Sequence, residues 1–81
     1  MDKIVIRNRI RELRFKSGEM TQQALADCVG ITRQTVIALE KEKYYPSLEL
    51  AFRIARVFNS PVEEVFKVAS EVPKKKPRKA T

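Results

Sequence analysis

Apolar residues recur at the spacing of a helix through most of this chain. Between residues 21 and 43 the spacing predicts two short helices joined by a tight turn. Their inward-facing residues are Leu25, Ala26 and Val29 in the first helix and Val36 and Leu39 in the second. Thr21 and Thr32 carry hydroxyls suited to cap the two helices, and Gly30 can end the first one in a left-handed conformation.

Helical spacing also precedes this pair. It predicts a helix from about Ile6, with Ile6, Ile10 and Leu13 facing inward. The β-branched run at residues 4–6 is also compatible with a short strand, because such side chains fit a pleated surface. We take the helix as the prediction.

Two further helices are predicted downstream. Ser47 caps a fourth helix that Asn59 closes, and Ser60 caps a short fifth helix over residues 61–66. The inward-facing residues of the fourth helix are Ala51, Ile54, Ala55 and Phe58. The pattern therefore predicts an all-α fold, a compact bundle of about five short helices in one domain over residues 1–66.

The net charge of the chain is weak evidence that the folded part binds DNA. The 81 residues carry a net charge of +7, which favours a polyanionic partner. Residues 67–81 hold six Lys/Arg against one Glu, a net of +5, so only +2 remains for the folded part. We expect residues 67–81 to form a flexible basic tail, which either only solubilises the protein or strengthens DNA binding without reading sequence.

Composition excludes several classes of protein. The chain has no histidine and a single cysteine, Cys28, so it offers neither an internal disulfide nor a Cys/His zinc site. It also lacks a Gly-rich phosphate loop, clustered acids and a base that could activate a serine, so we expect no enzyme, metal or cofactor. No apolar run is long enough for a membrane helix or a signal peptide, which favours the cytoplasm.

Two capped helices with this turn match the helix-turn-helix, whose second helix enters the DNA major groove. Six positions carry a closer resemblance: Gln22, Ala26, Gly30, Ile31, Val36 and Leu39. They are similar to the motif of the Xre-like family, which includes phage Cro and repressor proteins, and the likeness extends over roughly residues 6–66. The resemblance implies a lambda-repressor-like, prokaryotic regulator. Its expected partner is double-stranded DNA in the nucleoid, bound by a homodimer at a palindromic operator.

The outward face of the second motif helix, residues 32–41, supplies the candidate base-reading residues: Arg33, Gln34, Ile37 and Ala38. Arginine suits guanine, glutamine suits adenine, and apolar side chains suit the thymine methyl. The candidate phosphate contacts are Gln22, Thr32, Thr35, Lys41 and Lys43, with Gln22 taken from the resemblance. Arg9 has two interpretations, a solvated surface residue or a further phosphate contact.

The resemblance also implies a structural ion pair between Arg14 and Glu40. One position departs from the family, because Glu42 stands where a glycine commonly follows the motif. Tyr44 and Tyr45 are expected to pack over the loop, with a hydroxyl–phosphate contact as the alternative. Arg53 is expected only to solubilise the fourth helix.

A dimer interface is hypothesised near the C-terminal end of the domain. Its candidate residues are Phe52, Val62, Val65 and Phe66, although the last three could instead complete the core. The rival functional interpretation is a protein-binding adaptor, such as an antitoxin that holds a toxin, or a partner of another regulator. The low charge of the folded part permits it.

Overall fold

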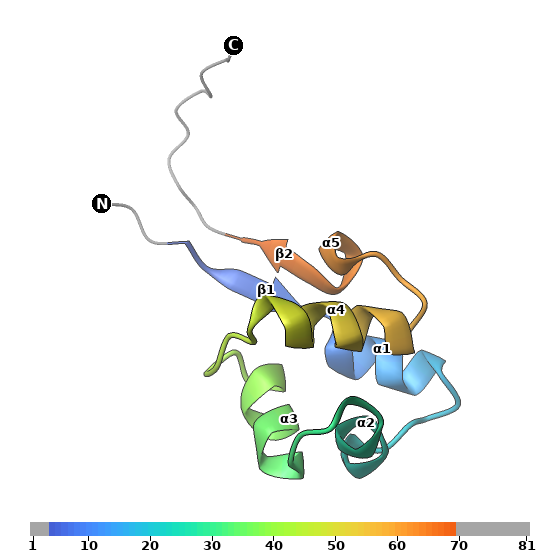
Figure 1. The fold of residues 1–81 in the computed structure, drawn as a ribbon. Helices are drawn as coiled ribbons and strands as arrows, with labels where there is room; N and C mark the ends of the chain where they lie inside the picture. Colours follow the sequence, from blue (N-terminus) through green and yellow to red (C-terminus); the bar gives the residue numbers. More distant parts are fainter. Residues whose placement is uncertain (1–3, 70–81) are drawn as a thin grey trace.

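A computed structural model describes residues 4–69 of the chain, and within them it contains five helices and one two-stranded sheet (Figure 1). In chain order the elements are β1 (Ile6–Asn8), α1 (Ile10–Lys16), α2 (Gln22–Val29), α3 (Arg33–Glu40), α4 (Leu48–Val57), α5 (Val62–Val65) and β2 (Phe66–Val68). This mostly helical architecture confirms the predicted bundle, to which the small sheet is an addition.

One apolar core joins all the helices described. Each helix contributes at least one completely buried side chain: Ile10, Leu25, Val36, Leu39, Ile54 and Val65. Burying a side chain of this kind stabilises a fold by roughly 1.5–3 kcal/mol. The inward faces predicted for residues 21–43 and for the fourth helix are therefore confirmed, and they hold α2 and α3 in a fixed relation.

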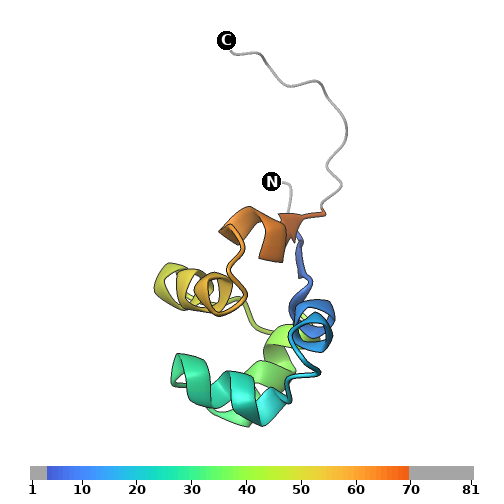
Figure 2. The same cartoon turned by 90° about the vertical axis from the view of Figure 1, so that its right-hand side faces the viewer.

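Side-chain caps explain where α2 and α3 begin. The Thr21 hydroxyl accepts a hydrogen bond from the N–H of Ala24 at 2.9 Å, and the Thr32 hydroxyl accepts one from Thr35 at 3.1 Å. Between them, Gly30 has a φ of 79°, a left-handed conformation that a Cβ would strain. The predicted caps and turn are confirmed. Figures 1 and 2 place α2 and α3 at the end of the molecule opposite α5 and β2.

The segment before α1 is a strand. In antiparallel register Ile6 lies opposite Val68, and Asn8 lies opposite Phe66. The predicted helix from about Ile6 is therefore wrong, because α1 begins only at Ile10. The partner strand lies about sixty residues further along the chain. The spacing of neighbouring residues therefore does not reveal the pairing that makes this segment a strand.

Polar contacts anchor β1 to the helices. The Asn8 side chain accepts from the N–H of Ile10 at 3.2 Å and donates to the carbonyl of Leu39 at 2.8 Å. It thereby supports the start of α1 and the end of α3 at once. The N–H of Ile6 donates to the Tyr45 hydroxyl at 3.1 Å, which occupies a backbone donor on the outer edge of β1.

The fifth helix is shorter than predicted. Pro61 is its N-cap, with an extended ψ of 154°, and no side chain caps it. The proposed Ser60 cap is therefore wrong, because the Ser60 hydroxyl donates instead to the carbonyl of Phe58 at 3.1 Å. Asn59 does close α4, as predicted, with a left-handed φ of 53°.

Strand β2 extends past residue 66, the predicted end of the domain. Phe66 leaves the helical conformation and starts β2, and Lys67 lies directly opposite Arg7 in the sheet. Residues 67 and 68 are thus strand residues of β2, and the N–H of Ala69 donates to the carbonyl of Val5 at 2.7 Å. The rest of the predicted basic tail, residues 70–81, lies outside the described residues.

Candidate nucleic-acid interface

The outward face of α3 forms a polar and apolar ridge. Arg33 and Gln34 are exposed, and Ile37 and Ala38 are half-buried. On the opposite face of the same helix Val36 is completely buried, so a rotation of the helix about its axis would expose this apolar side chain to water. All the candidate base-reading residues therefore lie on the side of α3 that is turned away from the core.

The hydroxyls at the start of α3 bond to one another. The side-chain oxygens of Thr32 and Thr35 lie 3.0 Å apart, and the Thr32 oxygen also accepts the backbone N–H of Thr35. One of the two hydroxyl protons is left for an external acceptor, because only one is needed between the oxygens. The N-terminus of α3 is thus capped internally, and one of its two threonine hydroxyls keeps a proton that is not used in this pair.

A buried ion pair connects α1 to α3. Arg14 Nε lies 2.7 Å from Glu40 Oε2, and Arg14 Nη2 lies 3.2 Å from Glu40 Oε1. The two side chains are only 7% and 9% exposed. Arg14 Nη1 also donates to the carbonyl of Met20 at 2.7 Å, which fixes the turn before α2. The geometry is that of a bidentate, charge-assisted pair.

Gln22 completes this polar cluster. Its Nε2 donates to Glu40 Oε1 at 3.2 Å, so the first residue of α2 is held toward the C-terminal end of α3. The cluster Arg14, Gln22 and Glu40 therefore joins three helices. The side chain of Gln22 remains half-buried and retains a second N–H, which a phosphate at the start of α2 can accept.

The end of α3 is closed by a Schellman motif. Glu42 has a left-handed φ of 61°, its N–H donates to the carbonyl of Leu39, and the N–H of Lys43 donates to the carbonyl of Ala38. Glu42 Oε1 lies 4.0 Å from Arg7 Nε, so its carboxylate is directed toward β1. Lys43, the last residue of the motif, is exposed.

Comparison with known proteins now identifies the family. A family model described as helix-turn-helix matches residues 10–65, most of the chain. The chain belongs to the Xre-like helix-turn-helix family. This is a family of DNA-binding transcriptional regulators and not of enzymes.

Relatives of this helix-turn-helix protein occur in archaea and bacteria. One from Archaeoglobus fulgidus is 57% identical over 61 residues, which span 75% of this chain and 86% of the relative. YgzD from Bacillus subtilis is 44% identical over 66 residues, which span 82% of this chain and 98% of YgzD. Both relatives carry the name of an uncharacterized HTH-type transcriptional regulator.

A crystal structure of a protein from Bacteroides fragilis, described as a candidate DNA-binding protein, has the same fold. The two superpose with a TM-score of 0.67 at 22% sequence identity, over 76% of this chain and 98% of that one. At this identity the likeness extends to the fold alone. No helix of residues 4–69 combines the length and the apolar character needed to cross a bilayer.

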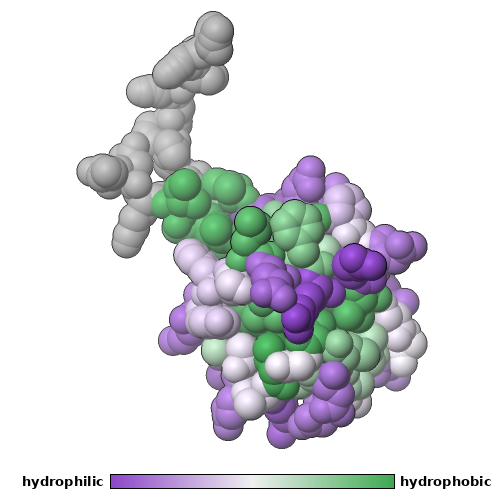
Figure 3. All heavy atoms as spheres, viewed as in Figure 1, coloured by the Kyte–Doolittle hydropathy of each residue, from purple (hydrophilic) through white to green (hydrophobic). Residues whose placement is uncertain are grey.

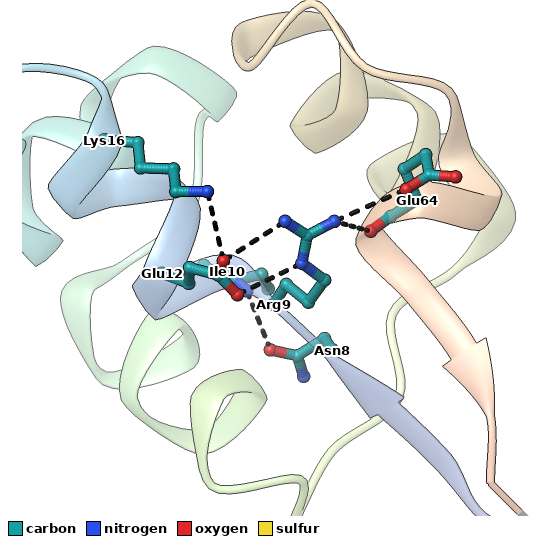
Figure 4. A network of polar contacts seen from close by, with 6 residues as sticks. All are labelled: Asn8, Arg9, Ile10, Glu12, Lys16 and Glu64. Carbon is teal, nitrogen blue, oxygen red and sulfur yellow. Dashed lines mark hydrogen bonds and ion pairs between the residues drawn. The ribbon is translucent and has the colours of Figure 1, made fainter.

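Arg9 of the helix-turn-helix domain is engaged with carboxylates. It donates to Glu12 at 3.1 Å and to Glu64 at 3.4 Å, while Lys16 lies 3.2 Å from Glu12 (Figure 4). The hydrogen bond from Arg9, reinforced by the one from Lys16, lowers the pKa of the Glu12 carboxyl to about 2. The same hydrogen bond, which Arg9 donates to the Glu12 carboxylate, raises the pKa of Arg9 in return. Arg9 is therefore more than a solvated surface residue, because its side chain connects the start of α1 to α5.

Two structural contacts of Arg53 were not predicted from the sequence. Arg53 Nη1 donates to the carbonyl of Val29 at 3.3 Å at the end of α2, and Arg53 Nη2 lies 2.8 Å from Glu49. Arg53 is thus more than a solubilising residue. The i,i+4 spacing of Glu49 and Arg53 signals their ion pair, but no local pattern signals the contact with Val29.

The residues suggested for a dimer interface differ in their exposure. Val65 is completely buried within one copy, so it belongs to the core and is not available to a partner. Val62 and Phe66 are half-buried against the core, whereas Phe52 is 52% exposed. A second apolar area lies at the outer end of the two strands, seen as green spheres in Figure 3, where Ile4 and Val68 are 60% and 67% exposed.

Proposed function

We propose that this chain binds a palindromic DNA operator as a homodimer and represses transcription there, with α3 in the major groove. The observation that carries the proposal is the exposed pair Arg33 and Gln34, held outward by a buried α3 face. The N-terminal part of a recognition helix is the part that meets base edges. Such a protein acts at the chromosome, in the nucleoid.

The chemistry of the ridge supports base recognition. Arg33 can donate two hydrogen bonds to O6 and N7 of guanine, and Gln34 can bond N6 and N7 of adenine. Ile37 and Ala38 offer apolar surface to a thymine methyl group. One helix face therefore presents both hydrogen-bonding and apolar side chains to the base pairs.

Phosphate contacts would set the position of α3. Lys41 and Lys43 are exposed at its C-terminal end, and one free hydroxyl donor, on Thr32 or on Thr35, lies at its N-terminal end. Gln22 adds a donor at the N-terminus of α2, where backbone N–H groups also favour an anion. These contacts orient the helix but carry no sequence information.

Dimerisation would present two recognition helices about 34 Å apart, one turn of DNA, over two half-sites. A small domain also gains stability from association, because it buries only about 60% of its unfolded surface alone. Exposed apolar side chains such as Phe52 supply contact area for a second copy. Sedimentation of the free chain and of its DNA complex tests the stoichiometry of two.

Selection of bound fragments from random DNA tests the function. We expect a palindromic consensus, and we expect Gln34→Ala to weaken binding to it by about 1–3 kcal/mol and to relax one base position in each half-site. Gln23→Ala is the matched control, because the Gln23 amide bonds Asp27 within α2. This control should leave the base preference unchanged.

Two results would contradict the proposal. Equal losses on the consensus and on random DNA for Gln34→Ala would argue against base readout. Tight capture of a protein partner by a chain that DNA does not retain would favour the adaptor or antitoxin alternative.

A further inference from the structure

We infer that Tyr44 belongs to the DNA-contacting surface and donates its phenolic O–H to a phosphate oxygen beside the bases that α3 reads. Its neighbour Tyr45 serves the fold instead. The inference rests on the proposed function and adds a residue to it. It also revises the expectation that both tyrosines simply pack over the loop.

The position of Tyr44 is the first support. Its side chain lines a surface hollow together with Gln34, Thr35 and Ala38, so the ring lies beside the outward face of α3. Tyr44 is 43% exposed there. A DNA strand that follows α3 must therefore pass close to this ring.

The free hydroxyl is the second support. Within residues 4–69 the Tyr44 hydroxyl has no hydrogen-bond partner, whereas the Tyr45 hydroxyl accepts the backbone N–H of Ile6 at 3.1 Å. Tyr45 precedes Pro46, which restricts it to an extended conformation. The Tyr45 hydroxyl therefore faces β1, whereas Tyr44 lies in the bend before it and lines the hollow beside the α3 face.

The chemistry selects a phosphate as the acceptor. A phenol carries one donor, which suits a group that only accepts, and its ring can pack against a methyl such as that of Ala38. A recognition helix inserted by its N-terminal end leaves its C-terminal end and the loop after it beside the DNA backbone. Lys43, one residue earlier, is exposed at the same place and supplies the charge that a phosphate attracts.

Tyr44→Phe is the test, because it removes the donor and keeps the ring. We expect binding to weaken about tenfold on the selected operator and on random DNA alike. The base preference should stay unchanged. The slope of log K against log salt should also stay unchanged, because a neutral donor releases no counterion. Tyr44→Ala, which removes the ring as well, should weaken binding further.

Tyr45→Phe is the matched control one residue away. It should bind DNA within about twofold of the parent chain and melt a few degrees lower, because it loses the bond to Ile6. Thermal melts followed by circular dichroism establish that the Tyr44 variants remain folded.

Three outcomes would overturn the inference. Equal affinity of Tyr44→Phe and the parent chain, in a protein that does select an operator, removes Tyr44 from the interface and leaves the proposed function standing. A loss confined to the operator, with an altered base preference, assigns Tyr44 to base reading instead of a phosphate. A parent chain that selects no sequence overturns the proposed function and this inference together.

Discussion

Removing Arg14 tests how strongly the polar cluster holds α3 in place. In Arg14→Met, Glu40 keeps a carboxylate that is only 9% exposed but loses both of its bonds to the guanidinium. Breaking a buried pair by deleting one partner costs about 3–5 kcal/mol, because the remaining charge is desolvated and unpaired. The carbonyl of Met20 also loses its donor.

This cost is large relative to the stability of the domain. A chain of 81 residues is expected to have a free energy of unfolding of roughly 4–12 kcal/mol. Urea unfolding followed by circular dichroism measures the change directly. With an m-value of about 1 kcal/mol/M for a small domain, we expect the midpoint to fall by about 3 M or more.

Arg53→Met is the matched control for Arg14→Met. The Arg53–Glu49 pair has nearly the same separation, 2.8 Å, but its side chains are 55% and 75% exposed. An exposed pair contributes about 0–1 kcal/mol. The contrast between the two variants therefore isolates the effect of burial from that of distance.

A double variant distinguishes an unpaired charge from lost packing. In Arg14→Met/Glu40→Met both charges are absent, so most of the lost stability should return. The reasoning is refuted if Arg14→Met loses less than about 1 kcal/mol, or no more than Arg53→Met. It is equally refuted if the double variant is less stable than Arg14→Met.

Three further predictions concern single positions. Glu42→Gly should raise the free energy of unfolding by about 1 kcal/mol, because Glu42 has a left-handed φ of 61° that glycine adopts without strain. Unchanged or lower stability in urea melts would contradict this prediction. The Glu12 carboxyl has its pKa lowered to about 2 by Arg9 and Lys16, so its contribution is complete above about pH 4.5 and is lost as the pH falls toward 2. The melting temperatures of the parent chain and Glu12→Gln at low salt should therefore converge over that range, and a constant difference would count against the pairing. Lys43→Ala should weaken binding to all DNA sequences alike and lower the salt slope by about one, as titrations at several salt concentrations would reveal; a loss restricted to one sequence would exclude a phosphate role.

Local pattern was sufficient for much of the fold and of the candidate interface. The two threonine caps, the left-handed Gly30 and the buried face of α3 all follow from residue type and helical spacing within a few positions. The exposure of Arg33 and Gln34 follows in turn, because a helix with one buried face must present the opposite one. These predictions needed no knowledge of distant residues.

Local residue patterns therefore specify the helix-turn-helix and the outward face of its second helix. Three features depend on contacts between distant parts of the chain: Ile6 lies in a strand, Gln22 bonds Glu40, and Tyr44 and Tyr45 contact different elements. The two groups of features differ in how far apart in the sequence the interacting residues lie. Caps and helical faces depend on neighbours within a turn of helix, whereas strand pairing and the convergence of polar side chains depend on groups that only folding brings together.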